Sequence, residues 1–389
     1  MTYIEQEKIR AAAWKRSTSS LPEETTIPAG YVNKDGITGS KLHDFCLPPS
    51  LAAHSLLPEV RQPALALFAE LGIPWHAGIN GGPSNHLLSS QVQCVNALAQ
   101  MITDPARILL AFGDLLAIEE VLEIEPGRFL TFEYIGPTDY FSEVPGGQRI
   151  RGAHCTSVDA AFLHRASDGV TELVLVEWKY TESYRRRKPD PKKDATRLGR
   201  YGTAVADPSG PVRADVLPFE LLLDEPLYQL VRQQLLADAL ERDGAEGAGR
   251  VRVVHVLPPA NAAYQHSLAR PEHRALGASV SEVWQKLLRD PDRFVSVDGK
   301  LFLDERITSR EYVLRYSDQV VHDADELFAA LDIPADAQEL EGLLDFHGDI
   351  VLYDDVVDFV IGTDGTGLAY PFEISELYAL ADELQAGDG

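Results

Sequence analysis

The chain has 389 residues, 45% of them hydrophobic, and a formal net charge of −25, a length that suits two or three domains and an apolar content ample for folded cores. Its charged N-terminus carries no apolar signal segment and no stretch approaches the length of a membrane span, which argues against a secreted or membrane protein. Three scattered cysteines offer neither metal-ligand spacing nor an even disulfide set, so we expect a cytoplasmic protein.

Residues 1–82 form the first predicted region, an N-terminal extension. The opening stretch MTYIEQEKIRAAAWKR is typical of a helix. A Pro- and Gly-rich stretch then leads to a short helix over residues 63–71. This region contains no catalytic motif, so we place the function further along the chain.

The stretch SNHLLSSQVQCVNALAQMI predicts the next helix. Ser89 or Ser90 is a good N-cap, and apolar residues follow at helical spacing. Residues 128–135, RFLTFEYI, then predict a β-strand, because they are rich in β-branched and aromatic residues. We expect this strand to be the first of a sheet, with Glu133 facing outward; the alternative is that Glu133 approaches the functional site from it.

Residues 156–184, TSVDAAFLHRASDGVTELVLVEWKYTESY, predict two strands joined by a turn at Ser-Asp-Gly. Both faces of the second strand are apolar, which is typical of a central strand covered on both sides. Alternation places Glu177 and Lys179 on one buried face, and Asp159 lies among apolar neighbours on the first strand. Burying an unpaired charge is costly, so these three groups must pair or hold a cation.

These residues predict a metal-dependent centre that cleaves phosphodiester bonds. Asp159, Glu177 and the backbone carbonyl of Trp178 are hard oxygen donors suited to Mg²⁺, for which Mn²⁺ is an acceptable substitute. Lys179 would orient the attacking water, help to deprotonate it, or neutralise charge on the phosphate. The alternative is a structural Asp–Lys or Glu–Lys pair within the sheet.

Asp159 followed by Glu-Trp-Lys at residues 177–179 resembles the signature of the PD-(D/E)XK nucleases, with Val158 where the signature has Pro. The phrases RGAHCTSVDA, ELVLVEWKYTESY and YQLVRQQLLA further resemble a family of restriction endonucleases. The resemblance covers residues 83–261 and implies an α/β fold with a restriction-endonuclease-like core, a mixed sheet flanked by helices in the order αβββαβ. It also implies an Mg²⁺-dependent deoxyribonuclease that acts in defence against foreign DNA.

The same resemblance brings three glutamines to the site. The first core helix of such nucleases often lends a polar side chain, and Gln91, alone or together with Gln93, is the matching residue here. The helix predicted over residues 226–240 carries Gln229 and Gln233 on one face. Related nucleases direct a Gln from this position toward the metal or the scissile strand. The alternative for these glutamines is a place on a solvated helix face.

Residues 184–200, YRRRKPDPKKDATRLGR, form a basic segment that leaves the strand carrying Glu177 and Lys179. Its Pro and Asp residues are expected to break any helix. Phosphate binding there would be independent of DNA sequence and sensitive to salt, whereas basic runs are in general often only solvated. The predicted nucleic-acid-binding residues are Arg151, Arg185, Arg186, Arg187, Lys188, Lys192, Lys193, Arg197 and Arg232.

Residues 250–257, RVRVVHVL, predict the last strand of the core, and residues 262–315 a mostly helical extension. Residues 316–389 form an acidic C-terminal domain, which contains 19 Asp and Glu and no Lys or Arg. The rest of the chain then has a net charge of only −6, which is compatible with a nucleic-acid enzyme. Strand patterns at residues 349–362 and 367–374, and a helix pattern ISELYALADEL, predict an α+β fold for the acidic part. Three roles are open for it: a solvated domain of a salt-tolerant cell, an oligomerisation or partner module, or a phosphate mimic that sits in the basic groove.

The sequence thus predicts a magnesium-dependent nuclease whose partner is DNA, and leaves open a homodimer and a partner protein of a defence system. Two other functions stay open: a catalytically silent scaffold that binds DNA or recruits a partner, and a nuclease specific for RNA or for DNA junctions. The intact set of Asp159, Glu177 and Lys179 argues against the silent scaffold.

Overall fold

The computed structural model of the chain describes residues 2–144 and 146–317, together with the backbone of four strands beyond residue 319. The chain divides into two compact units. One is residues 19–313, and the other combines residues 1–18 with 314–389. The larger unit contains the whole region that resembles a nuclease.

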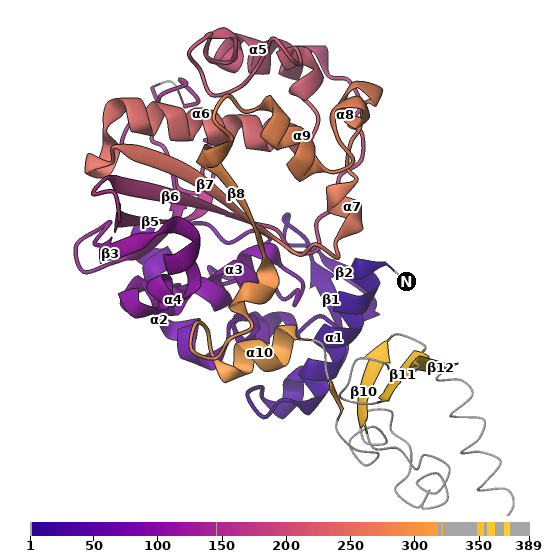
Figure 1. Ribbon diagram of the computed structural model, residues 1–389. Coiled ribbons are helices and arrows are strands. Elements are labelled where there is room, and N and C mark those ends of the chain that lie inside the picture. The colour runs from indigo at the N-terminus through magenta and orange to yellow at the C-terminus, as the bar shows by residue number, and fades with distance from the viewer. Residues whose placement is uncertain are drawn as a thin grey trace, which may run out of the picture. The chain divides into compact units, whose positions relative to one another are not determined.

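The larger unit consists of a two-stranded hairpin, a six-stranded sheet and helices on both sides of that sheet (Figure 1). Its elements in chain order are β1 (Ala29–Val32), β2 (Thr38–His43), α2 (Pro58–Leu71), α3 (Ser90–Leu98), α4 (Pro105–Leu116), β3 (Ile118–Leu122), β4 (Leu130–Tyr134), β5 (Val158–Ala166), β6 (Thr171–Trp178), α5 (Pro191–Ala206), α6 (Leu227–Asp243), β7 (Arg250–Leu257), α7 (Ala262–Gln265), α8 (Pro271–Leu276), α9 (Val280–Leu287) and β8 (Phe294–Asp298).

The six-stranded sheet is mixed, with β3, β5, β6, β7 and β8 as neighbours in that order. β4 and β3 share one edge of the sheet: β4 pairs with the first half of β5 and β3 with its second half, both antiparallel. β5 and β6 are antiparallel, whereas β6, β7 and β8 run parallel. The mixed sheet predicted from the sequence is confirmed, and β5 and β6 lie at its centre.

Helices cover both faces of this sheet, as the apolar pattern on both sides of β6 predicts. α5, α6 and α9 lie on one side and α2, α3 and α4 on the other (Figure 1). On the α6 side, Leu173 and Leu175 of β6 belong to one buried cluster with Leu230 of α6. On the other side, Phe162 of β5 packs against Phe112 of α4, with ring centroids 5.0 Å apart. Burying each such side chain stabilises the fold by about 1.5–3 kcal/mol.

Local signals set the ends of the two helices that carry the predicted glutamines. Ser89 caps α3, because its hydroxyl accepts a hydrogen bond from the backbone N–H of Val92 at 3.3 Å. α6 ends at Gly244, whose φ of 63° lies in the left-handed region that glycine adopts without a steric penalty. Both predicted helices are confirmed within a few residues.

The basic segment is partly helical, so the prediction that its Pro and Asp residues break any helix was wrong. Asp190 is the N-cap of α5 and accepts a hydrogen bond from the backbone N–H of Lys193 at 3.1 Å. Pro191 occupies the first helical position, where its missing N–H leaves no hydrogen bond unmade. Asp and Pro therefore start this helix.

The sheet contains two strands beyond those predicted. β3 has the sequence IEEVL, in which two glutamates obscure the strand pattern. β8 has the sequence FVSVD and lies within the region predicted to be mostly helical. The helices α7, α8 and α9 do occupy that region, and their apolar residues Trp284 and Leu287 are buried, as is Leu288.

The smaller unit begins with α1 (Tyr3–Ser17), which confirms the predicted N-terminal helix. Its C-terminal part is a four-stranded antiparallel sheet. The predicted strand patterns account for three of these strands, and the strand at Val320–Val321 was not predicted. The remaining elements are α10 (Arg310–Tyr316), which crosses the boundary between the units, β9 (Val320–Val321), β10 (Gly348–Tyr353), β11 (Val356–Ile361) and β12 (Ala369–Glu373). The predicted helix ISELYALADEL lies outside the described residues. Within the described residues, the helices are too short or too polar to cross a membrane.

Candidate active site

The register of the sheet brings Asp159 and Glu177 opposite each other. Ala160 of β5 pairs with Val176 of β6, so one step further along these antiparallel strands Asp159 faces Glu177. Residues directly opposite each other in such a pair project to the same side of the sheet, with Cβ atoms about 4.5–5.5 Å apart. Lys179, two residues after Glu177, follows on that side. The predicted trio therefore shares one face.

Asp159 combines a fixed orientation with partial access to solvent. Its Oδ2 atom accepts a hydrogen bond from the backbone N–H of Trp178 at 2.7 Å. Its Oδ1 atom receives no hydrogen bond from the described residues, and the side chain is half-buried. Burial, followed by the charge of Glu177, raises the pKa of this carboxyl group well above its ordinary value. An ionised Asp159 is therefore poorly compensated in the protein alone.

Glu177 is 2% exposed and holds three hydrogen-bond donors. Its Oε1 atom accepts from Lys179 Nζ at 2.6 Å and from Gln229 Nε2 at 2.7 Å. Its Oε2 atom accepts from Gln233 Nε2. The structure thus brings together Glu177, Lys179 and both glutamines that were predicted on α6.

Lys179 is 6% exposed and lies in an electronegative environment. Burial by itself would lower the pKa of its ammonium group, but the surrounding charges, that of Glu177 foremost, raise the pKa well above its ordinary value.

His255 on β7 is paired with Glu177 in the register of the two parallel strands. Burial, followed by the charge of Lys179, lowers the pKa of His255 to about 3, so this imidazole is neutral. It contacts the hydroxyl of Tyr264 at 3.2 Å.

Glu133 belongs to the same site, so the prediction that it faces outward was wrong. Its Oε2 atom accepts a hydrogen bond from Ser157 Oγ at 2.9 Å, and its Oε1 atom accepts one from Gln91 Nε2 at 3.0 Å. Gln91 in turn accepts from the backbone N–H of His76 at 2.8 Å. Burial raises the pKa of Glu133, opposed by these two hydrogen bonds. Glu133 has a φ of 48°, in the left-handed region, so the chain departs from regular strand geometry at this residue.

The residues present fit a hard divalent cation, on the condition that Glu177 gives up one of its hydrogen bonds. Among the described residues, no three His, Cys, Asp or Glu side chains form a ready-made metal cluster. Mg²⁺, however, is usually held by one or two carboxylates, with water and substrate oxygens completing its shell. The Oδ1 atom of Asp159 is available as a metal ligand, whereas Glu177 would have to exchange at least one of its hydrogen-bond donors for the metal ion. The carbonyl of Trp178 accepts a hydrogen bond from Ser90 Oγ at 3.1 Å and keeps a second lone pair.

The predicted nucleic-acid-binding residues fall into four groups, of which Arg151 forms the last. Four of them are exposed side chains at the start of the basic segment and of α5: Arg185, Arg186, Lys188 and Lys192. Arg187 is held by an ion pair with Asp194 at 2.7 Å and by the carbonyl of Leu223 at 2.9 Å. Lys193, Arg197 and Arg232 line a pocket between α5 and α6.

Arg151 has internal partners. Its guanidinium donates to Glu125 Oε1 at 2.6 Å, to Thr131 Oγ1 at 2.7 Å and to the carbonyl of Phe132 at 3.2 Å. A phosphate contact from Arg151 remains a prediction that competes with these bonds. Without Arg151, the partly buried Glu125 keeps Arg128 and Thr131 as donors but loses its closest ion pair, at 2.6 Å.

The variant Arg151→Ala is therefore expected to lose about 1.5–3 kcal/mol of stability, the usual contribution of a hydrogen bond to a charged group. Thermal unfolding measures this loss, with Arg165→Ala, an exposed charge at the far end of β5, as the charge-matched control. An unchanged unfolding temperature together with a shallower salt dependence of DNA binding would instead assign Arg151 to a phosphate.

The mixed sheet, the helices on both of its faces and the acidic pair with a lysine on β5 and β6 define a protein of the restriction-endonuclease-like class. The chain belongs to the family described as restriction endonuclease associating with ARP, whose model matches residues 8–319. No curated protein and no solved structure matches the chain. Membership in this family confirms the resemblance to restriction endonucleases and supports a nuclease-like function.

Proposed function

We propose that the chain is a metal-dependent nuclease that hydrolyses phosphodiester bonds of DNA. The observation that carries this proposal is the position of Asp159, Glu177 and Lys179 on one face of the sheet, where β5 begins and β6 ends. A buried ion pair alone requires one carboxylate, and the site holds Asp159 and Glu133 in addition. The excess of carboxylates fits a site that receives a cation.

Asp159, Glu177 and the Trp178 carbonyl would hold the ion, which when bound supplies Lewis-acid stabilisation of phosphate charge and lowers the pKa of water. Mg²⁺ is the proposed ion, with Mn²⁺ as a substitute. Lys179 is ion-paired at 2.6 Å, so we assign it as a fixed positive charge that orients the attacking water and offsets charge developing on the phosphate. Its alternative role, deprotonating that water, requires Lys179 to leave the pair with Glu177.

Three glutamines act as positioning residues in this proposal. Gln229 and Gln233 lie one turn apart on α6 and donate to different oxygens of Glu177, which fixes the plane of that carboxylate. Gln91 links Glu133 to the loop that contains His76. A catalytic group held by such bonds needs less reorganisation when the substrate arrives.

The DNA partner is proposed from the family and from the basic segment. Arg185, Arg186, Lys188 and Lys192 are exposed close in sequence to Lys179, where contacts with backbone phosphates would be independent of sequence. The family description names restriction and an association with ARP. We therefore propose a role in defence against foreign DNA and a binding partner, and a homodimer is a further proposal.

A catalytically silent scaffold is the second candidate, because the three donors on Glu177 satisfy that carboxylate without a cation. Incubating the protein with linear and circular DNA separates the two functions. A nuclease degrades DNA with Mg²⁺ or Mn²⁺ and not with EDTA, whereas a scaffold binds DNA and leaves it intact in every condition. The same assay on RNA and on branched DNA tests those substrates.

Metal binding is expected even when DNA is absent. Calorimetric titration of Mg²⁺ and Mn²⁺ into the protein should show binding that the variant Asp159→Asn loses, because an amide is a weaker ligand than a carboxylate. Arg165→Ala serves as the control and should bind like the wild type. Equal binding by the wild type and Asp159→Asn would remove Asp159 from the ligand set.

A further inference from the structure

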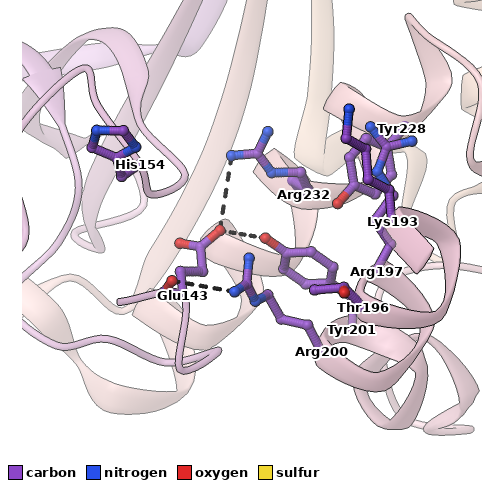
Figure 2. Close-up of a pocket in the computed structure, with 9 residues that line it drawn as sticks. All are labelled: Glu143, His154, Lys193, Thr196, Arg197, Arg200, Tyr201, Tyr228 and Arg232. Atoms are coloured by element: carbon purple, nitrogen blue, oxygen red, sulfur yellow. Dashed lines mark hydrogen bonds and ion pairs between the residues drawn. The ribbon is translucent and has the colours of Figure 1, made fainter. Parts of the chain in front are cut away.

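A basic pocket of about 300 Å³ lies beside the candidate active site, between the loop before β5 and the helices α5 and α6 (Figure 2). This volume is at the lower end of the range for small-molecule sites, large enough for one nucleotide-sized ligand. Its lining residues are Glu143, His154, Lys193, Thr196, Arg197, Arg200, Tyr201, Tyr228 and Arg232. We name it the α5–α6 pocket.

The charges of this pocket are unbalanced. Lys193 and three arginines contribute four positive charges, whereas Glu143 is the one acidic side chain among the lining residues. The Glu143 carboxylate already has hydrogen-bond donors from the protein. It accepts from Thr156 Oγ1 at 2.6 Å, from the backbone N–H of Thr156 at 2.7 Å and from the Tyr201 hydroxyl. Figure 2 shows the Tyr201 and Arg232 side chains directed at this carboxylate. About three positive charges remain for a ligand.

The arginines are held in place by contacts that leave donors available. Arg197 stacks on the ring of Tyr228 at 4.2 Å and donates to the carbonyl of Leu223. Arg200 donates one N–H to the carbonyl of Glu143 at 3.2 Å. Within the described residues, neither Arg197 nor Arg200 forms an ion pair with a carboxylate. Guanidinium groups that are oriented but electrically uncompensated are suited to bidentate recognition of phosphate.

We propose that the α5–α6 pocket binds a phosphomonoester, the doubly charged phosphate at the end of a nucleic-acid strand or on a free nucleotide. Several converging cations match a dianion better than the single charge of an internal phosphodiester. The buried tyrosines Tyr201 and Tyr228 support this arrangement, because the Tyr228 ring holds Arg197 in a stacked position. Binding of a phosphomonoester stands by itself, and the strand-end source rests on the proposed nuclease function.

The pocket is connected to the candidate active site. Arg232 Nε donates to Thr156 Oγ1 at 3.1 Å, and Thr156 precedes Asp159 by three residues. Three residues of extended chain span about 10 Å, roughly three base steps of duplex DNA. Arg232 also lies between Gln229 and Gln233 on α6. A strand whose terminal phosphate occupies the pocket would therefore place a phosphodiester a few nucleotides from its end near the carboxylates.

Binding is measured in EDTA, so that the result does not depend on cleavage. The probes are duplexes with 5′-phosphate, 3′-phosphate or hydroxyl ends, together with thymidine 5′-monophosphate and thymidine. We expect one phosphorylated duplex, or the monophosphate, to bind about tenfold more tightly than its hydroxyl counterpart. Preference for a duplex identifies the strand end as the source, and preference confined to the monophosphate identifies a free nucleotide.

Two variants test whether the preference for phosphorylated probes comes from the α5–α6 pocket. Arg200→Gln removes a charge that makes one backbone contact, and Lys193→Ala removes an exposed charge whose ion pair with Asp190 is 3.6 Å long. Both should fold and reduce the preference, whereas Arg165→Ala should retain it. Equal affinity for phosphorylated and hydroxyl probes, or a preference unchanged in both variants, would overturn the proposal. Cleavage of circular DNA would in that case still support the nuclease. A phosphate preference without cleavage would retain the pocket and remove the nuclease.

Discussion

Replacing Asp159 with Asn is expected to reduce DNA cleavage by at least about 10³-fold, within the range for loss of a group that stabilises transition-state charge. The amide keeps an oxygen for the backbone N–H of Trp178 but offers a metal no negative charge. Burial raises the pKa of Asp159 in the folded protein, so its ionised form opposes folding at neutral pH. Asp159→Asn should therefore unfold, in EDTA, at a temperature no lower than the wild type.

This combination separates a functional carboxylate from a structural one. Cleavage of linear and circular DNA gives the activity, and thermal unfolding in EDTA gives the stability. A lower unfolding temperature would indicate that Asp159 serves mainly to stabilise the sheet. Activity close to that of the wild type would exclude Asp159 as a metal ligand and, with it, the proposed mechanism.

The variant Glu177→Gln is expected to lose both activity and stability. Removing one member of a buried ion pair leaves the other charge uncompensated, which usually costs about 3–5 kcal/mol. Here the stranded charge is the ammonium of Lys179, which is 6% exposed. Loss of activity in Glu177→Gln alone is therefore ambiguous, because destabilisation also lowers it.

The double variant Glu177→Gln with Lys179→Met removes this ambiguity. Both charges are absent, so most of the lost stability should return, while cleavage should stay undetectable. Urea denaturation of the four proteins in the cycle measures the coupling between the two residues. A double variant no more stable than Glu177→Gln would show that the ion pair is not what stabilises this part of the sheet. Lys179→Met alone should lower kcat while leaving Mg²⁺ affinity, measured by calorimetry, nearly unchanged.

Most of the nuclease core was predictable because its signals are local. The apolar pattern of β5 and β6, the capping serine before α3 and the helical spacing in α6 each depend on neighbouring residues. These elements carry Asp159, Glu177 and Gln229, so the central part of the site followed from the sequence. The predicted resemblance supplied what spacing does not, the placement of glutamines from two helices around one pair of strands.

The parts that escaped prediction depend on contacts between distant segments. Glu133 joins the site because β4 pairs with the first half of β5, and it is held there by Gln91, 42 residues away. His255 lies beside Glu177 because β7 runs parallel to β6 in one particular register. The sequence of either strand alone does not predict that register. α5 was missed for a different reason: Pro191 was taken as a helix breaker, although at the first position it favours helix formation.

Burial within the trio makes the site one-sided. Glu177 and Lys179 are sealed beneath α6, whereas Asp159 retains contact with solvent. An incoming ion or phosphate must therefore approach from the side of Asp159, and Glu177 lies at the closed end of the site. Substitutions that widen the α6 side would admit bulk water behind the substrate, while those around Asp159 would govern which substrates enter.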